Sequence, residues 1–132
     1  MKNFRSILSV LALVVFSACN GESEAVIGQY TTIEVDPVYD GGTVAKGEIV
    51  RAEIKIKNTG DYPLVLAEVK GACSCTVSEF SKDPVAPGES TIIRAEVDTD
   101  KTGKGLINKS VTIMANTRPA RTQVTVQAKV ID

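Results

Sequence analysis

The sequence predicts an all-β sandwich. Short apolar runs alternate with polar residues at a period of two, and Gly, Pro, Asn and Asp separate the runs. No stretch carries the apolar stripe of an amphipathic helix. About seven short strands with turn signals roughly every eight to twelve residues are typical of an immunoglobulin-like antiparallel β-sandwich. We therefore expect that architecture for the folded part of the chain.

The first 18 residues are expected to form a lipoprotein signal peptide. A positively charged start precedes an apolar run from Ile7 to Phe16, which is too short to span a bilayer. Ser17 and Ala18 place small residues directly before Cys19, as in the lipobox of bacterial lipoproteins. Cys19 is therefore the expected lipidated N-terminus; the alternative is an ordinary secretory signal with a chance cysteine.

Residues 19–29 are expected to be a flexible tether, and residues 30–132 the sandwich domain. The tether is small and polar and lacks periodicity. The whole chain has 132 residues, so the part after the signal is long enough for one domain with a hydrophobic core and too short for two.

Composition narrows the function classes. Without the two basic residues of the signal, 13 Lys and Arg stand against 16 Asp and Glu, and no basic cluster exists that could follow phosphates. Nucleic acid is therefore not an expected partner. The chain has no His, which removes the commonest general base and the commonest transition-metal ligand. We expect no catalysis and no cofactor.

The first half of the domain is expected to contain three strands and a short extended piece. The clearest strand is Glu48–Asn58, whose charged residues alternate with apolar ones that should face the core. The expected elements are, in order, the strand Thr31–Val35, a turn at Tyr39–Gly42, the short segment Thr43–Val44, the strand Glu48–Asn58, a turn at Asn58–Asp61 and the strand Leu64–Val69. The inward residues of the clearest strand are Val50, Ala52, Ile54 and Ile56.

The second half is expected to continue in the same way. Pro84, Pro87 and Gly88 mark a loop before the next alternating run. The expected elements are a short extended piece at Cys73–Val77, the strand Thr91–Val97, a polar loop at Asp98–Gly105 and the closing strands Lys109–Ala115 and Gln123–Ile131.

Cys73-Ser74-Cys75 is the one motif with evident chemical potential. In an extended segment both sulfurs would face one side, with Cα atoms about 6.5 Å apart, near the upper limit for a disulfide. Such a bond would be strained and easy to reduce. Three interpretations stay open: two packed thiols, a tight disulfide that is structural or redox-active, and a dithiolate for a soft metal. Cu(I) could take Met114 as a third ligand, whereas no His or further Cys is present to complete a zinc site.

Asp98–Gly103 begins like a calcium-binding loop, with oxygen ligands at the first, third and fifth positions and glycine at the sixth. Lys109 stands at the twelfth position, where the loop requires a bidentate Glu. The sequence therefore predicts a solvated connection between two strands, and no metal site there.

Several short turn motifs follow one another in a characteristic order between Thr31 and Val130. In that order the chain resembles the bacterial domain-of-unknown-function family 1573. The residues that carry the resemblance are Asn58-Thr59-Gly60-Asp61, Pro63-Leu64, Cys73-Ser74-Cys75-Thr76, Pro87-Gly88-Glu89, Gly105, Lys109 and Asn116. The family's domains are similar to immunoglobulin-like modules of ciliary and major-sperm-protein-like proteins, and many members are lipoproteins of Bacteroidetes. The resemblance implies a sandwich and implies no activity.

These observations together predict a lipid-anchored module of the cell envelope with a structural or protein-binding role. Its expected partners are a membrane, reached through the N-terminal lipid, and an unidentified envelope protein; the outer membrane is the expected location. The alternative is a small periplasmic redox or Cu(I)-binding protein that uses Cys73 and Cys75.

Overall fold

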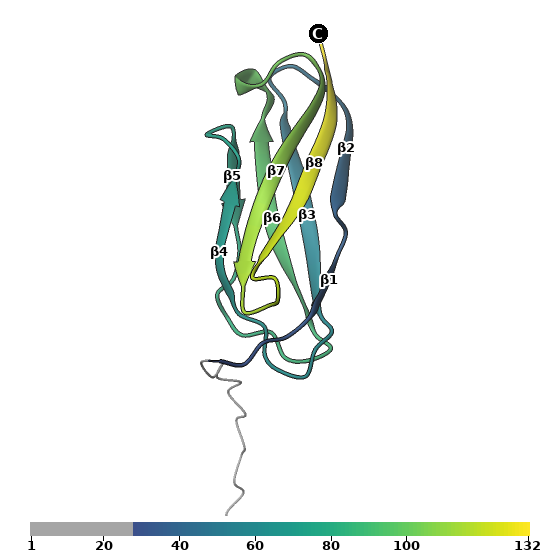
Figure 1. The fold of residues 1–132 in the computed structure, drawn as a ribbon. Coiled ribbons are helices and arrows are strands. Elements are labelled where there is room, and N and C mark those ends of the chain that lie inside the picture. Colours follow the sequence, from purple (N-terminus) through teal and green to yellow (C-terminus); the bar gives the residue numbers. More distant parts are fainter. Residues whose placement is uncertain (1–27) are drawn as a thin grey trace, which may run out of the picture.

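The computed structural model describes residues 28–132, which form two packed four-stranded sheets (Figure 1). The residues expected to form a signal peptide, and Cys19 after them, lie outside the described residues. Within this part of the chain no helix is long and apolar enough to cross a membrane. The elements are β1 (Ile33–Val35), β2 (Val38–Ala45), β3 (Ile49–Asn58), β4 (Leu66–Gly71), β5 (Thr76–Glu79), β6 (Ser90–Asp98), the 3-10 turn η1 (Thr99–Lys101), β7 (Gly105–Ala115) and β8 (Arg121–Ile131).

The predicted fold class is confirmed. One sheet has the order β1-β3-β6-β5 and the other β2-β8-β7-β4. These orders correspond to the two sheets of an immunoglobulin-like sandwich, with β2 added beside the last strand. The predicted alternation of β3 is also confirmed, because every second residue is buried. The core consists mainly of Val, Ile, Leu and Ala from β3, β4, β6, β7 and β8.

The expected turn at Tyr39–Gly42 is wrong, because these residues belong to β2. β2 pairs with β8 in parallel, the one parallel pair among the strands of residues 28–132, and its register shifts between Asp40 and Thr43. The Asp40 carboxylate accepts the Gly42 N–H at 2.8 Å, and Gly42 has a φ of 71°. The glycines thus form an irregularity within a strand. This strand raises the count from the expected seven to eight.

The chain changes sheets between β1 and β2. β1 pairs with β3, and after Asp36 the chain crosses to the other sheet, where the Thr125 N–H donates to the Pro37 carbonyl at 2.8 Å. Pro37 suits this place because proline has no N–H to contribute to a sheet. Both sheets are therefore joined along one side of the sandwich.

We call the end where the chain enters at Gly28 the tether end; it contains the β3–β4, β5–β6 and β7–β8 loops (Figure 1). Asn58 is fully buried there. Its Oδ1 accepts the Thr31 hydroxyl at 2.6 Å and the Gly60 N–H at 3.1 Å, while its Nδ2 donates to the carbonyls of Tyr62 and Val85, each at 2.8 Å. All side-chain bonding positions of this amide are thus used.

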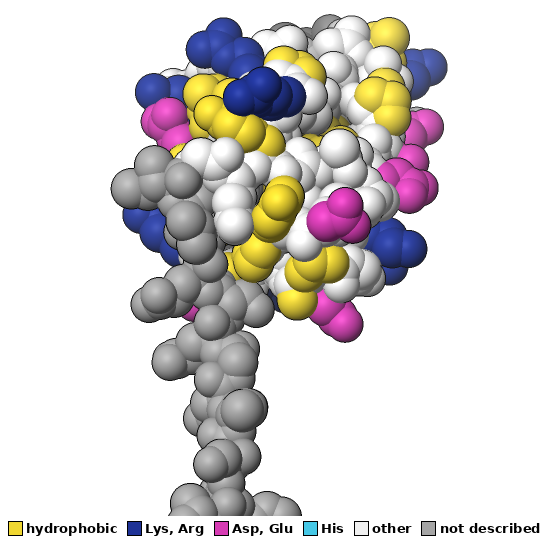
Figure 2. Space-filling model, turned by 60° about the horizontal axis from the view of Figure 1, so that its bottom comes forward, with side chains coloured by type: hydrophobic (Ala, Val, Ile, Leu, Met, Phe, Trp, Pro, Cys, Tyr) yellow, Lys and Arg dark blue, Asp and Glu magenta, His cyan; other side chains and the backbone are white. Residues whose placement is uncertain are grey.

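Asn116 plays a similar role beside it. Its Oδ1 accepts the Val65 N–H at 2.7 Å, and its Nδ2 donates to the carbonyls of Pro63 at 2.8 Å and Gln29 at 3.3 Å. Its own carbonyl accepts the Thr31 N–H at 2.9 Å. Gln29, which was expected to belong to the tether, is therefore attached to the folded domain. Figure 2 shows the tether end, where apolar side chains lie among polar ones and charges of both signs lie around the rim.

Candidate functional site

The cysteine pair lies at the end of the sandwich opposite the tether end. We call it the disulfide end; it contains the turn Ala72–Cys75, η1 and the C-terminus (Figure 1). Cys73 and Cys75 are joined by a disulfide, and their Cα atoms are 5.2 Å apart. The expectation of an extended segment from Cys73 to Val77 is wrong for its first three residues, which form a turn closed by the Thr76 N–H donating to the Cys73 carbonyl at 3.1 Å.

The turn takes this shape because it joins the two sheets. β4 belongs to one sheet and β5 to the other, so the chain must cross the sandwich within a few residues. Gly71 lies so close to Thr76 that a Cβ on Gly71 would stand 2.6 Å from the Thr76 Cβ. Only glycine permits this approach. The close approach therefore fixes the path on which the two cysteines meet.

The two cysteines differ in exposure. Cys75 is 4% exposed, whereas Cys73 is half-buried. The Cys75 Sγ lies 3.8 Å from the buried Thr76 hydroxyl. An incoming reagent therefore reaches the disulfide from the Cys73 side. In this oxidised form neither sulfur is a thiolate, and the thiolate is the form that attacks disulfides and binds metals.

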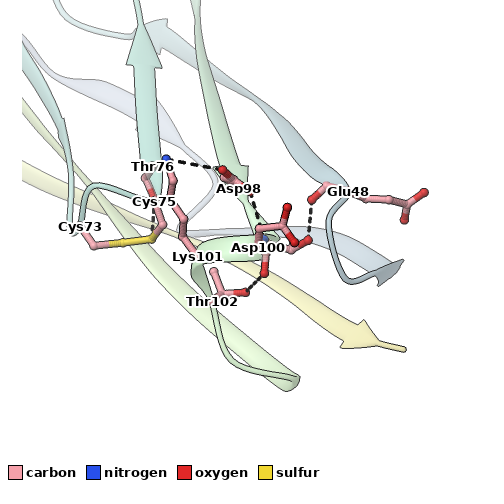
Figure 3. A network of polar contacts seen from close by, with 9 residues as sticks. Glu48, Cys73, Cys75, Thr76, Asp98, Asp100, Lys101 and Thr102 are labelled. Carbon is pink, nitrogen blue, oxygen red and sulfur yellow. Dashed lines mark hydrogen bonds and ion pairs between the residues drawn. A yellow bond between two sulfur atoms is a disulfide. The ribbon is translucent and has the colours of Figure 1, made fainter.

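The disulfide turn is attached to η1 (Figure 3). The Asp98 N–H donates to the Cys75 carbonyl at 2.9 Å. The Asp98 side chain caps η1, since its Oδ1 accepts the Asp100 N–H at 3.0 Å, and its Oδ2 lies 3.5 Å from the Lys101 Nζ. Asp98, the first residue of the calcium-like motif, thus stabilises a turn. In residues 28–132 no group of three or more Cys, Asp, Glu or His side chains is placed to hold a metal ion.

Thr99 organises the same end, and the sequence did not single it out. It is fully buried, and its hydroxyl accepts the Gly47 N–H at 2.9 Å and donates to the Glu48 carbonyl at 2.6 Å. The Thr102 hydroxyl donates to the Thr99 carbonyl at 3.0 Å, and the Lys46 ammonium donates to the Thr102 carbonyl at 2.9 Å. The β2–β3 and β6–β7 connections are thereby held together. The signal available in the sequence was Asp98 before a short turn, a common N-cap residue.

The structure does not bring Met114 to the cysteine pair. Met114 lies on β7 opposite Glu68, while Gly71, which precedes the disulfide turn, lies opposite Val111. Three residues of strand separate Met114 from Val111 by roughly 10 Å, and Cys73 lies beyond Gly71 on the far side. A copper site of two cysteines and Met114 would therefore need a different arrangement of this sheet.

Comparison with known proteins identifies relatives of the fold. A protein of unknown function from Porphyromonas gingivalis W83 is similar at 27% identity and a TM-score of 0.67, over 76% of this chain and 47% of that one. The chain thus spans about half the length of that protein. The ASH/PapD-like domain 7 of human CEP192 has a TM-score of 0.59 at 10% identity, over 83% of this chain and 95% of that domain.

The secreted serine protease VesC of Vibrio cholerae contains a similar fold over 24% of its chain, with a TM-score of 0.60 at 13% identity over 77% of this chain. At this identity the likeness shows the fold alone. No curated protein sequence matches the chain. The family model described as protein of unknown function (DUF1573) matches residues 32–130. Together with the sandwich and the ordered turn motifs, this match shows that the chain belongs to the DUF1573 family.

Proposed function

We propose that this protein is a lipid-anchored module of the cell envelope with a structural or protein-binding role and without catalysis. The observation that carries the proposal is the attachment of the first described residues to one end of the sandwich. Asn116 bonds to Gln29 and Thr31, and the Arg118 guanidinium lies 4.0 Å from the centroid of the Tyr30 ring. A lipid on Cys19 would therefore act on a fixed point of the fold.

The distance between that point and the anchor is short. Even fully extended, the nine residues from Asn20 to Gly28 span at most about 30 Å. The tether end would then face the membrane, and the disulfide end would face away from it. An anchor of this kind orients the domain and leaves its two sheet faces accessible to other proteins.

The two outer faces of the sandwich differ in a way that supports protein binding. The outer face of β3 and β6 is charged, with ion pairs between Arg51 and Glu96 at 3.1 Å and between Arg94 and Glu53 at 3.6 Å. The outward residues of β7 and β8 are mostly uncharged, with Arg121 and Lys129 near the two ends of β8. Interface cores are depleted in charged residues, because charges are costly to remove from water. The uncharged outward residues include Asn108, Ser110, Thr112, Thr125 and Gln127.

The lengths of the relatives favour a modular role. Similar domains make up about half of the Porphyromonas gingivalis protein and about a quarter of VesC, so this fold serves as one part of larger proteins. A domain that forms one part of longer chains has its own core and folds as a separate unit, so it can serve as a binding or spacing module beside other domains. We infer the same kind of role here.

The anchor is tested by Cys19→Ala in the full chain, expressed in a bacterial host and fractionated. The unaltered protein should sediment with membranes and carry the added mass of a lipid at its N-terminus. Cys19→Ala should yield an unprocessed or a soluble form, while the matched control Cys73→Ser should stay with the membranes. A Cys19→Ala protein that is processed and still sediments with membranes overturns the proposal.

A second candidate function is thiol–disulfide exchange, and the half-buried Cys73 beside the buried Cys75 favours it. A partner dithiol would attack the Cys73 sulfur, and Cys75 would leave as a thiolate. The second thiol of the partner would then release Cys73, so that two electrons pass to this protein and the partner becomes a disulfide. A disulfide that closes a loop of only three residues restricts the unfolded chain very little. The resulting gain in folding stability is only about 1.6 kcal/mol at 25 °C. Stability alone therefore accounts poorly for it.

This second candidate is tested by intact mass after alkylation, with and without prior reduction, and after incubation with Cu(I). Two thiols alkylated only after reduction would define a disulfide, and a reduction potential above about −300 mV would support exchange. A lower potential would identify a structural bond. Two thiols that are alkylated without reduction and protected by Cu(I) would instead favour metal binding.

A further inference from the structure

The change of sheet between β1 and β2 leaves a groove on one side of the sandwich, near the tether end. The groove has a volume of about 440 Å³ and lies between β1 and the hairpin that joins β7 to β8. Its size is within the range of about 300–1,000 Å³ that is typical of ligand pockets. Ile33 and Val35 contribute one wall, and Thr117, Arg118, Pro119 and Thr122 contribute the other.

The outer edge of β1 presents unpaired backbone groups to this groove. The N–H and carbonyl of Asn58 bond to Glu89 and Gly88 on the β6 side, so Ile33, which lies opposite Asn58, bonds to no β3 backbone group. In an antiparallel pair of strands, hydrogen-bonded and non-hydrogen-bonded residue pairs alternate, so Val35, two residues after Ile33, also makes no backbone bond to β3. The N–H and carbonyl groups of both residues therefore point away from β3. Within residues 28–132, neither has a backbone partner on that outer side.

A second open strand edge lies next to the opposite wall, beside Thr122, the residue of β8 that lines the groove. The Thr125 N–H points toward β2 and donates to Pro37. Gln123 lies two residues earlier on β8, so its backbone groups point the same way, but β2 begins only at Val38, opposite Thr125. In the described part of the chain, no strand lies beside Gln123 on that side. Two strand edges with free donors and acceptors thus flank one groove.

We propose that this groove binds an extended, uncharged peptide segment of a partner protein, which adds to β1 as a fifth strand of its sheet. The proposal rests on the proposed protein-binding role and specifies the partner's chemistry. Free N–H and carbonyl groups at alternate residues of β1 match the repeat of an extended strand, and no other regular structure offers that repeat. The two ionisable side chains along the groove, Glu34 and Arg118, have opposite charges. The walls therefore favour a ligand segment that carries no net charge.

The walls also decide between a single strand and a second copy of this chain. The edge of β1 is flanked by the β7–β8 hairpin, with Thr117, Arg118 and Pro119 on the opposite side of the groove. A lone strand brings no loops and no facing sheet with it. The sheet edge of a second folded domain would carry its own loops and facing sheet into the hairpin. The shape of the groove therefore favours a segment that is extended before it binds.

The test uses the acetylated and amidated heptapeptide Ser-Val-Thr-Val-Thr-Val-Ser as the probe. The protein is the chain from residue 19 onward with Cys19→Ala, and amide hydrogen exchange is measured with and without the peptide. At saturation the amides of Ile33, Val35 and Gln123 should exchange at least tenfold more slowly. The same peptide with every amide N-methylated should not bind. It has no N–H groups left to donate to the carbonyls of the two strand edges.

A matched pair of proline variants locates the binding edge. Val35→Pro removes a donor that points into the groove. Ser78→Pro removes a donor from β5, at the opposite edge of the same sheet, because the Cys75 carbonyl already bonds to β6 and Ser78 therefore points outward. Proline is tolerated at such edge positions. Val35→Pro should weaken binding about tenfold, and Ser78→Pro should leave it unchanged; both variants are first checked for cooperative melting.

Three outcomes would overturn the proposal. They are unchanged exchange at Ile33 and Val35 at saturation, equal binding of the N-methylated peptide, and protection of these amides in a dimer that forms without peptide. The last outcome would assign the edge to a second copy. The N-methylated peptide requires no change in the protein, so the test holds even if Val35→Pro fails to fold. Membrane fractionation of Cys19→Ala tests the anchor separately, and its result does not depend on the groove.

Discussion

Replacing Asn58 by alanine should cost this domain a large share of its stability. Asn58 is fully buried at the tether end, and its amide makes four hydrogen bonds, to the β3–β4 loop, the β5–β6 loop and Thr31 just before β1. Each bond contributes about 1 kcal/mol net, and truncation leaves two carbonyls and two donors without their partner. We expect a loss of about 4 kcal/mol. Single domains typically unfold with about 5–15 kcal/mol in total.

The assay is equilibrium unfolding in urea, followed by circular dichroism at 25 °C. With a slope of about 2 kcal/mol/M, a loss of about 4 kcal/mol lowers the midpoint by about 2 M without changing the slope. Asn108→Ala is the matched control, because Asn108 is exposed on the outer face of β7 and its loss should change stability by no more than about 0.5 kcal/mol.

Asn58→Asp separates hydrogen bonding from packing. This variant keeps the size of the side chain and the acceptor for Thr31 and Gly60, but it places an oxygen against the carbonyls of Tyr62 and Val85. If the amide matters through its donors, Asn58→Asp should destabilise the domain at least as much as Asn58→Ala. A neutral Asn58→Asp, or a loss below about 1 kcal/mol for Asn58→Ala, would refute the assignment of Asn58 as the centre of this end.

Three further predictions concern the core, the disulfide and η1. Ile54→Asp buries an unpaired charge at a position that is 3% exposed and should abolish cooperative melting, whereas Ile92→Asp, at 42% exposure, should leave melting nearly unchanged. Replacing Cys73 and Cys75 together by Ser should lower the free energy of unfolding by less than about 2 kcal/mol; a larger loss would show that the disulfide stabilises the whole domain. Thr99→Val should cost about 2 kcal/mol in urea unfolding, since the Gly47 N–H loses its acceptor, and an unchanged midpoint would contradict that role.

Strands with one buried and one wet face could be predicted from the sequence. Buried and exposed residues alternate along β3, β6 and β8, because each strand packs one face on the core. The same period of two is visible in the sequence as apolar residues that alternate with polar ones. Of β2, only the segment Thr43–Val44 was expected, and the first part of the strand was missed for two physical reasons. Its glycines match the composition of a turn, and its partner is the parallel β8, whose paired residues lie 86 or 87 positions away in the chain. A parallel pairing over that separation leaves no local sequence signal.

The polar centres could be predicted only in part. Asn58 was expected in a turn and Asn116 contributed to the family resemblance, but their bonds reach backbone groups of other loops, such as Val85 and Val65. Such partners carry no side-chain signature, because every residue has the same carbonyl and N–H. The turn at Cys73 was missed for a related reason. Two apolar residues with a spacing of two, such as Cys73 and Cys75, predict an extended segment. The chain turns there because β4 and β5 belong to different sheets, which the local sequence does not indicate.

The groove and the disulfide should act independently, because they lie at opposite ends and on opposite edges of one sheet. In the order β1-β3-β6-β5 the peptide would add beyond β1, while the disulfide turn leads into β5. Among residues 28–132, none that lines the groove makes a backbone hydrogen bond to the turn. Effects of separated sites usually add within about 0.5 kcal/mol. Reducing Cys73 and Cys75 should therefore leave peptide affinity unchanged, and a shift of more than about threefold would show that the two edges of this sheet are coupled.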